Sequence, residues 1–314
     1  FTYPLIGNYG VTEEDYESDG IKVEGVVVRE VCDRPSNWRS RKSLGEFVLE
    51  FKIPGIYGVD TRSLTRKIRA SGTMKSVLQT YADKVDLEAL KREAREQKSI
   101  SELNLVERVS ANEVERVESG SGNYEVALID CGAKRSIIDN LLKWGANVTL
   151  LPFNTSAEDI LSYHPDAVLI SNGPGDPAMV KETIAEARKL IGKTVLYGIC
   201  LGHQIISLAL GAGTYKLKFG HRGLNQPVKD LETGRVFIST QNHGFAVAEE
   251  GLAETGLEVT HINLNDNTIE GLKHRELPIR TVQYHPEAGP GPHDTYFFFD
   301  SLINDMEGGN AKKD

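Results

Sequence analysis

The chain has 314 residues, of which 39% are hydrophobic and 26% charged, and its formal net charge is −9. This composition is typical of a globular protein of about two domains, and the negative charge argues against a nucleic-acid partner, because phosphate binding needs a basic surface. No stretch approaches the roughly 20 apolar residues that span a bilayer, and no basic-then-apolar leader opens the chain, so we expect a cytoplasmic protein without membrane contact.

The three cysteines, Cys32, Cys131 and Cys200, are odd in number, far apart and without CxxC spacing. They therefore indicate neither a disulfide framework nor a thiolate zinc site, and we expect no metal in this chain. The first residues, "FTYPLIGNYG", lack an initiator methionine and read as the inside of a strand and turn. We therefore expect further residues before Phe1.

The first third of the chain differs from the rest in composition and in the pattern of its apolar residues. Asp83–Gln97 reads as a charged amphipathic helix, and the segment 106–122, "VERVSANEVERVESGSG", is polar, weakly patterned and ends in Gly and Ser. Such a composition is typical of a linker. The sequence therefore predicts a first domain at 1–105, a linker at 106–122 and a second domain at 123–314.

From Tyr124 onward short apolar runs alternate with amphipathic helical segments. Strands are expected at 124–132, 147–153, within 166–177 and at 194–200, and helices at 134–145, 157–163, 179–192 and 201–211. This alternation predicts an open, doubly wound, flavodoxin-like α/β domain, in which ligands bind at the carboxyl ends of the strands. Two strand ends, Asn172–Pro177 and Gly198–Gly202, are expected to be neighbours.

The remainder of the second domain reads as shorter β segments followed by one helix. The β segments are expected at 234–247, 257–264, 268–274 and 279–285, and the helix at 295–306.

Cys200 lies in "YGICLGHQ", where an apolar strand turns into a helix. Flanking glycines tolerate the crowded backbone of a tight elbow, and the helix N-terminus favours a thiolate and can receive an oxyanion. Cys32 and Cys131 have no such context and read as small hydrophobic residues. For Cys200 the motif favours a nucleophile, although a structural turn stays open from these residues alone.

A candidate base follows the apolar run "IRTVQY". His285 is followed by Pro286 and Glu287, so a carboxylate lies two residues on, on the same side of an extended segment. A histidine that pairs a thiol and is oriented by a carboxylate is the usual arrangement of nucleophile, base and orienting group. The tripeptide is a weak signal alone, but it becomes specific beside the strand-end cysteine.

These motifs resemble a known family. "GICLGHQ", the downstream "HPE" and the earlier "SNGPGDP" are similar to class I, triad-type glutamine amidotransferases. "LKFGHRGLNQPV", "STQNHGFAV" and "HPEAGPGPHDT" resemble the small subunits of glutamine-dependent carbamoyl-phosphate synthases. "IPGIYGVDTRSLTRKIR" and "GTMKS" resemble the N-terminal domain of those subunits, which other amidotransferases lack.

The resemblance implies a role for each motif residue. Cys200 is the implied nucleophile, His285 the general base and later acid, and Glu287 the residue that orients the imidazole. The backbone N–H groups of Gly173 and Leu201 are the implied oxyanion hole. The implied glutamine contacts are Gly173, Gly175, Leu201, Gln204, Asn242, Gly244 and Phe245, although the glycines of "NGPGDP" and Asn242 also read simply as turn formers. The family also has a serine upstream of "TYP", before the first residue of this sequence.

The implied activity is hydrolysis of glutamine to glutamate and ammonia through a cysteine thioester. The implied partner is a large synthetase subunit that binds ATP and magnesium and makes carbamoyl phosphate from bicarbonate, for pyrimidine and arginine biosynthesis. This chain has neither a G-x-x-x-x-G-K-[ST] loop nor a dinucleotide fingerprint, so we expect no cofactor in it. The first domain is expected to dock the partner, or alternatively to bind a ligand of its own.

Two other classes of function stay open. One is a different amidotransferase of this type, such as an anthranilate or aminodeoxychorismate synthase subunit, or a peptidase or γ-glutamyl hydrolase of the same fold; the segment "GVDTRSLTRKIR" counts against these. The other is a non-catalytic scaffold subunit. The presence of Cys200, His285 and Glu287 counts against that reading.

Overall fold

The computed structural model describes residues 1–80 and 84–310, in two compact units, Phe1–Ser99 and Ile100–Asp314. Each unit is described by itself. Within the described residues, no helix is both long enough and apolar enough to cross a membrane.

The N-terminal unit combines short strands with helices. Its strands form two parallel pairs, β1 (Leu5–Ile6) with β3 (Glu30–Val31) and β2 (Val26–Val27) with β4 (Gly55–Ile56). Its helices are α1 (Leu44–Glu50), α2 (Thr61–Ser71) and α3 (Leu87–Glu96), with a 3-10 turn, η1, at Glu13–Asp15.

Each of these α-helices begins after a capping side chain. Ser43, Asp60 and Asp86 accept hydrogen bonds from backbone N–H groups in the first turns of α1, α2 and α3. Such caps satisfy donors that the helix itself cannot. Helix α3 confirms the amphipathic helix expected in this region, although the predicted first residue, Asp83, lies outside the described residues.

The second unit is built on one ten-stranded sheet, in the order β11-β10-β12-β13-β14-β9-β8-β6-β7-β5. Five neighbouring strands, β7-β6-β8-β9-β14, are parallel, and the others join antiparallel. In chain order the parallel strands read 2-1-3-4-5, which is the flavodoxin-like arrangement. The strands are β5 (Glu115–Val117), β6 (Tyr124–Asp130), β7 (Ala146–Pro152), β8 (Ala167–Ile170), β9 (Val195–Ile199), β10 (Thr214–Asp230), β11 (Val236–Val247), β12 (Leu257–Asn263), β13 (Ile269–His274) and β14 (Ile279–Val282).

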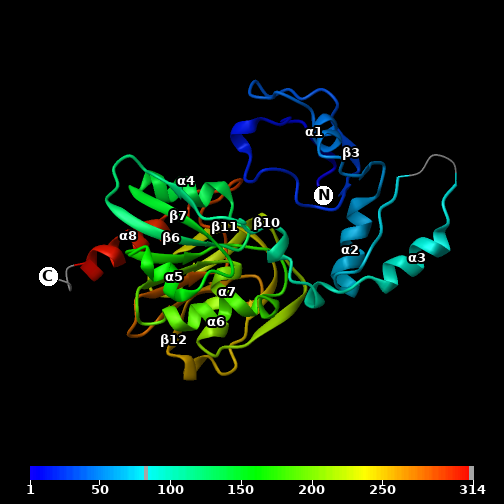
Figure 1. Cartoon of the computed structure of the whole chain (residues 1–314). Coiled ribbons are helices and arrows are strands. Elements are labelled where there is room, and N and C mark those ends of the chain that lie inside the picture. The colour runs from blue at the N-terminus through cyan, green and yellow to red at the C-terminus, as the bar shows by residue number, and fades with distance from the viewer. Residues whose placement is uncertain (81–83, 311–314) are drawn as a thin grey trace. The chain divides into compact units, whose positions relative to one another are not determined.

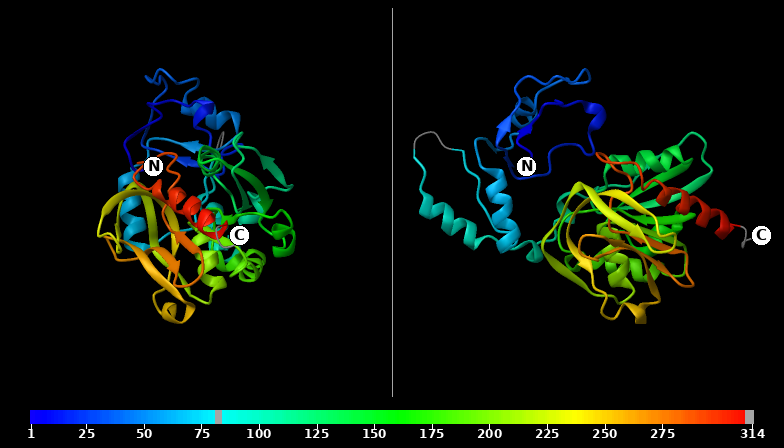
Figure 2. Two further views of the ribbon diagram at one scale, coloured as in Figure 1. Left: turned by 90° about the vertical axis from the view of Figure 1, so that its left-hand side faces the viewer. Right: turned by 180° about the vertical axis from the view of Figure 1, so that it is seen from behind.

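Helices cover both faces of the parallel strands (Figure 1, Figure 2). Val126 and Leu128 of β6 pack into one core with α4 (Arg135–Lys143) and α8 (Phe297–Asn310), and the alternate residues Ala127 and Ile129 pack into a second core with α5 (Ala157–Ser162), α6 (Lys181–Leu190) and α7 (Leu201–Ala209). A strand buried on both faces reads as a continuous apolar run. The unit also has 3-10 turns at Ile100–Glu102, Val106–Arg108, Pro177–Met179 and Leu252–Thr255.

The segment 106–122, expected to be a linker, lies within the second unit. Val106 is fully buried in the core beside α5 and α6, and β5 pairs antiparallel with β7 at the sheet edge. The polar composition of β5 is that of an edge strand with one protein neighbour, which the sequence does not distinguish from a linker.

Strand β10 also differs from the expected short segments, because it runs for 17 residues. Its pairing with β11 shifts register twice, between Lys216 and His221 and between Gly223 and Gln226. Such β-bulges interrupt the alternation of apolar and polar residues, so that the sequence pattern of one long strand is lost.

Candidate active site

Cys200 occupies the turn between β9 and α7. Its backbone has φ 53° and ψ −99°, a conformation that non-glycine residues rarely adopt, and its N–H donates to the carbonyl of Val282 at 2.8 Å. The side chain is 4% exposed. The predicted elbow is thus confirmed, with the sulfur at the N-terminus of a helix.

Two glycines allow the elbow to form. A Cβ atom on Gly198 would lie 2.6 Å from the carbonyl carbon of Gly202, and a Cβ atom on Gly202 would lie 2.1 Å from the carbonyl oxygen of Ile170. Ile170 and Gly198 are register partners in the β8–β9 pair, so the two strand ends are neighbours, as expected. Three backbone segments meet here with no space for side chains.

His285 follows β14, where its N–H donates to the carbonyl of Thr240 in β11 at 2.9 Å. Its Nδ1 atom lies 2.7 Å from Oε1 of Glu287, and the Cys200 sulfur lies close enough to the ring to raise its pKa. Both His285 and Glu287 are buried. The structure thus brings the thiol, the imidazole and the carboxylate of these three residues together.

The electrostatics of this group favour a charged imidazole and a charged carboxylate. Burial opposes the charge on His285, but the Glu287 carboxylate and the Cys200 sulfur together raise its pKa to about 10. Burial likewise opposes ionisation of Glu287, but the charges of His285 and Lys134 hold its pKa below the usual value. An imidazole poised to hold a proton next to the sulfur can accept one from a thiol and pass it on.

The two expected oxyanion donors lie close together. A Cβ atom on Gly173 would lie 2.3 Å from the carbonyl oxygen of Cys131 and 2.6 Å from Cδ2 of Leu201. In the described part of the chain, neither the N–H of Gly173 nor that of Leu201 has a hydrogen-bond acceptor. Two free donors beside the cysteine can receive a developing oxyanion.

The other expected glutamine contacts lie on helix α7, on strand β11 and in the loop after β8. Gln204 and Phe245 are joined to the site, since Nε2 of Gln204 donates to the Phe245 carbonyl at 2.8 Å. Asn242 and Gly244 lie on the same strand as Phe245, and the Asn242 side chain is exposed. Gly175, with φ 98°, lies beside Leu105 in the loop after β8.

Comparison with known proteins gives two family matches. Residues 1–78 match the carbamoyl-phosphate synthase small chain, CPSase domain, and residues 127–305 match glutamine amidotransferase class-I. The chain is 59% identical to the carbamoyl phosphate synthase small chain of Archaeoglobus fulgidus, over 96% of this chain and 84% of the relative. The chain belongs to the carbamoyl-phosphate synthase small-chain family. The Methanopyrus kandleri relative is 51% identical, over 96% of this chain and 84% of that relative.

A solved structure supports the fold of the part of the chain that matches the amidotransferase family. A GMP synthase protein from Thermoplasma acidophilum is 18% identical, with a TM-score of 0.54, over 60% of this chain and 97% of that one. The likeness extends to the fold alone.

Lys134, the residue before α4, is a member of the site that sequence reasoning missed. Its Nζ atom lies 3.0 Å from Oε1 of Glu287 and also donates to the carbonyl of Ala288. Its position just after β6, at the carboxyl edge of the sheet, is a signal that could have pointed to it.

Gln283, near the end of β14, was also missed. Its Nε2 atom donates to the Cys200 sulfur at 3.6 Å, and its Oε1 atom accepts from Nε2 of Gln204 at 2.8 Å. It therefore links the Cys200 sulfur to Gln204 of helix α7 and, through Gln204, to Phe245. In "TVQYHPE" it stands two residues before the base, on the same side of the extended segment.

Proposed function

We propose that this chain hydrolyses glutamine to glutamate and ammonia at Cys200, and passes the ammonia to a large synthetase subunit. The observation that carries the proposal is the buried group of Cys200, His285 and Glu287 at a strand-to-helix elbow, with two unpaired N–H groups beside the sulfur. Membership of the carbamoyl-phosphate synthase small-chain family supports glutamine as the substrate.

The proposed reaction proceeds in two halves. The Cys200 thiol gives its proton to His285, and the thiolate then attacks the side-chain amide carbon of glutamine, while the oxyanion is held by the N–H groups of Gly173 and Leu201. His285 then gives its proton to the leaving nitrogen, so that ammonia departs and a γ-glutamyl thioester remains. Water, deprotonated by His285, attacks the thioester, and the proton returns to the sulfur as glutamate leaves.

The proposed acceptor of ammonia is carbamoyl phosphate synthesis on the large subunit, from bicarbonate and ATP with magnesium, for pyrimidine and arginine biosynthesis. The term "small chain" in the names of the relatives supports such a partner. In this proposal the ATP chemistry belongs entirely to the partner, and the present chain supplies ammonia.

The test is glutamate release from glutamine by the full chain, alone and with a large synthetase subunit. We expect release by the wild-type chain to rise with the partner, and Cys200→Ser to lose it by at least about 1,000-fold. Cys32→Ser, which removes a thiol from the other unit, is the matched control and should keep full activity. Equal inactivity of wild type and Cys200→Ser with the partner present would support the scaffold alternative.

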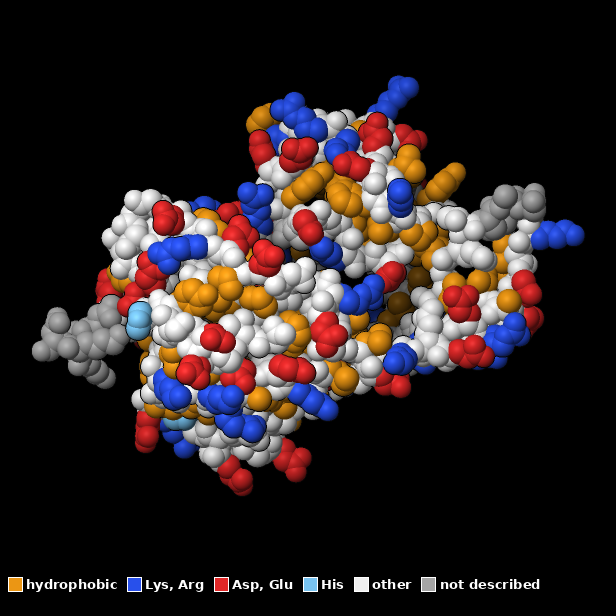
Figure 3. Space-filling view, in the orientation of Figure 1, with side chains coloured by type: hydrophobic (Ala, Val, Ile, Leu, Met, Phe, Trp, Pro, Cys, Tyr) orange, Lys and Arg blue, Asp and Glu red, His pale blue; other side chains and the backbone are white. Residues whose placement is uncertain are grey.

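The N-terminal unit is proposed to dock the large subunit. Its exposed large apolar residues include Trp38 at 90%, Leu49 at 77% and Tyr57 at 75%, and exposed apolar residues of this size are typical of interaction surfaces. Figure 3 shows hydrophobic side chains at the surface of the protein. We expect Trp38→Ala to weaken association with the large subunit by at least about tenfold. Trp144→Ala, at an exposed tryptophan of the second unit, is the control, and equal weakening by both variants would contradict the docking role.

A further inference from the structure

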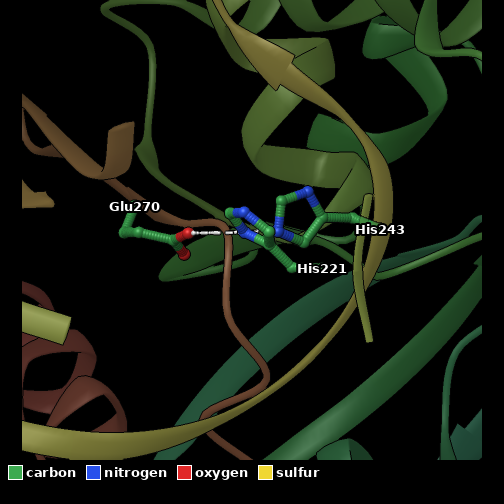
Figure 4. A group of neighbouring side chains, drawn as sticks. All are labelled: His221, His243 and Glu270. Carbon is green, nitrogen blue, oxygen red and sulfur yellow. Dashed lines mark ion pairs between the residues drawn. The ribbon is translucent and has the colours of Figure 1, made fainter. Parts of the chain in front are cut away.

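A second group of buried, titratable side chains includes none of Cys200, His285 and Glu287. His221 of β10, His243 of β11 and Glu270 of β13 converge inside the antiparallel part of the sheet, with their ligand atoms within 4.8 Å of one another (Figure 4). All three are buried. Gln241 of β11, also buried, directs its side-chain oxygen at both imidazoles.

Four of the distances between these donor atoms lie between 2.9 and 3.9 Å. Oε1 of Gln241 lies 2.9 Å from Nδ1 of His221 and 3.1 Å from Nε2 of His243. Oε1 of Glu270 lies 3.4 Å from the same atom of His221 and 3.9 Å from that of His243. Ligands at about 2.0–2.2 Å from a tetrahedral zinc ion are about 3.3–3.6 Å apart. Zinc binding therefore requires the Gln241 oxygen to move away from both imidazoles and the Glu270 oxygen to approach His243.

The other nitrogen of each imidazole is already engaged. Nε2 of His221 lies 2.8 Å from Oδ2 of Asp266, and Nδ1 of His243 lies 2.8 Å from the carbonyl oxygen of Phe245. In metal sites a histidine ligand characteristically donates its second N–H to a carboxylate or a backbone carbonyl, which orients the ring and fixes its tautomer. With those protons so placed, the lone pairs of Nδ1 of His221 and Nε2 of His243 face the cluster.

The cluster has more acceptors than donors. Two imidazole lone pairs, the Gln241 oxygen and the Glu270 carboxylate meet here, and Ser239 supports this orientation of Gln241 by accepting from its Nε2. The hydroxyl of Thr268 and Nδ2 of Asn263 face Oε1 of Glu270 at 3.4 Å, a long distance for a hydrogen bond. The Gln241 amide is a further group that favours the charged form of the Glu270 carboxylate. Oε2 of Glu270, although buried, has no partner within the described residues. A buried, electron-rich group of this kind needs a positive charge, which either a metal ion or a proton on His221 supplies.

We propose that His221, His243, Glu270 and the side-chain oxygen of Gln241 bind a zinc ion. The ion joins three strands, β10, β11 and β13. Strand β11 also carries three of the expected glutamine contacts, Asn242, Gly244 and Phe245. A zinc ion bound to Gln241 and His243 would therefore hold this strand in position. This departs from the expectation of no metal in this chain, which rested on cysteine spacing. Gln241 and His243 stand two residues apart on β11, whereas His221 and Glu270 are about 20 residues or more from them and lie on other strands.

The test is zinc binding by the full chain after its metal has been removed with a chelator. Zn²⁺ is titrated in competition with a chromophoric chelator, and the zinc content is measured by mass spectrometry. We expect one zinc per chain, and Co²⁺ in its place should give the intense visible bands of a tetrahedral site without a thiolate charge-transfer band. Asp266→Asn should weaken binding by about 10–100-fold, and Glu270→Gln by more.

Two control variants test whether other side chains of this protein bind the zinc. Cys200→Ser removes the buried thiol beside His285, and Glu258→Gln removes an exposed carboxylate from the neighbouring strand β12; both should bind zinc as wild type does. Absence of stoichiometric zinc on the wild-type chain would overturn the proposal, and a proton on His221 would then balance the charge of Glu270. Retention of zinc by Glu270→Gln, or loss of zinc in Cys200→Ser, would overturn it as well. The wild-type titration and the cobalt spectrum decide the question even if Glu270→Gln fails to fold.

Discussion

Nζ of Lys134 lies 3.0 Å from Oε1 of Glu287, the same carboxylate oxygen that lies 2.7 Å from Nδ1 of His285. One carboxylate oxygen therefore pairs with two cationic groups. Because Glu287 is buried, its charge depends on both of them.

We expect Lys134→Met to weaken both the fold and the activity. Loss of one cation leaves a buried carboxylate with less compensation, so the free energy of unfolding should fall by about 1–3 kcal/mol, and glutamate release should slow by about tenfold. Urea unfolding and the glutaminase assay check these values. Lys181→Met, at an exposed position of α6, should change neither; an unchanged Lys134→Met would contradict the role given to the ion pair.

The raised pKa of His285 predicts a pH dependence of stability. A group whose pKa rises on folding contributes stability that is full below its ordinary pKa of 6.5, and that is lost as pH rises through its folded value of about 10. Between these pH values the wild-type chain should lose at least about 1 kcal/mol more free energy of unfolding than His285→Gln. Urea unfolding at a series of pH values measures the difference, and parallel curves for the two proteins would refute it.

Addition of a single methyl group at the Cys200 elbow should lower the free energy of unfolding. In Gly202→Ala the new Cβ atom would lie 2.1 Å from the backbone oxygen of Ile170, which cannot move without β8. We expect a loss of about 1–3 kcal/mol in the free energy of unfolding, with loss of glutaminase activity. Gly308→Ala, on α8 with no atom within 4 Å of the new Cβ, should be stabilised by about 0.5–1 kcal/mol. Equal effects of the two substitutions would rule out this account of the elbow.

Gln283 is predicted to favour the reactive form of the cysteine. Its amide donates to the Cys200 sulfur, so Gln283→Glu places a negative charge where a donor was. We expect alkylation of Cys200 by iodoacetamide at neutral pH to slow by at least about tenfold, because two like charges at this distance repel. Gln79→Glu, an exposed position in the N-terminal unit, is the control. A Gln283→Glu chain that is alkylated at the wild-type rate would show that the amide has no influence on the thiol.

The parallel core could be predicted from the sequence because each of its strands is buried on both faces. The centre of β6, residues 126–129, and the whole of β9 therefore read as apolar runs, and the glycines around Cys200 mark the turn that follows β9. The antiparallel part was harder to predict. The long strand β10 contains Gly220, Gly223 and Pro227, and its bulges hide the period of two on which strand prediction depends.

The candidate site was predictable where its residues are close in sequence, and not where they meet only in the fold. Glu287 follows His285 by two residues, so one extended segment presents both. Lys134 reaches the same carboxylate from 153 residues away. The group of His221, His243 and Glu270 likewise requires the pairing of three strands, which no local pattern specifies.

The hydrogen bond from the His285 N–H to the Thr240 carbonyl joins two main-chain atoms. Replacement of the Thr240 side chain removes neither atom, so the course of β11, and not the identity of any residue on it, sets the location of the base. The Thr240 hydroxyl makes a separate hydrogen bond, to the carbonyl of Pro290 at 3.1 Å, so a substitution at position 240 acts on the loop after Glu287 and not on the bond that holds His285. Comparison of sequences alone will therefore underestimate how strongly this strand contributes to the geometry of the site.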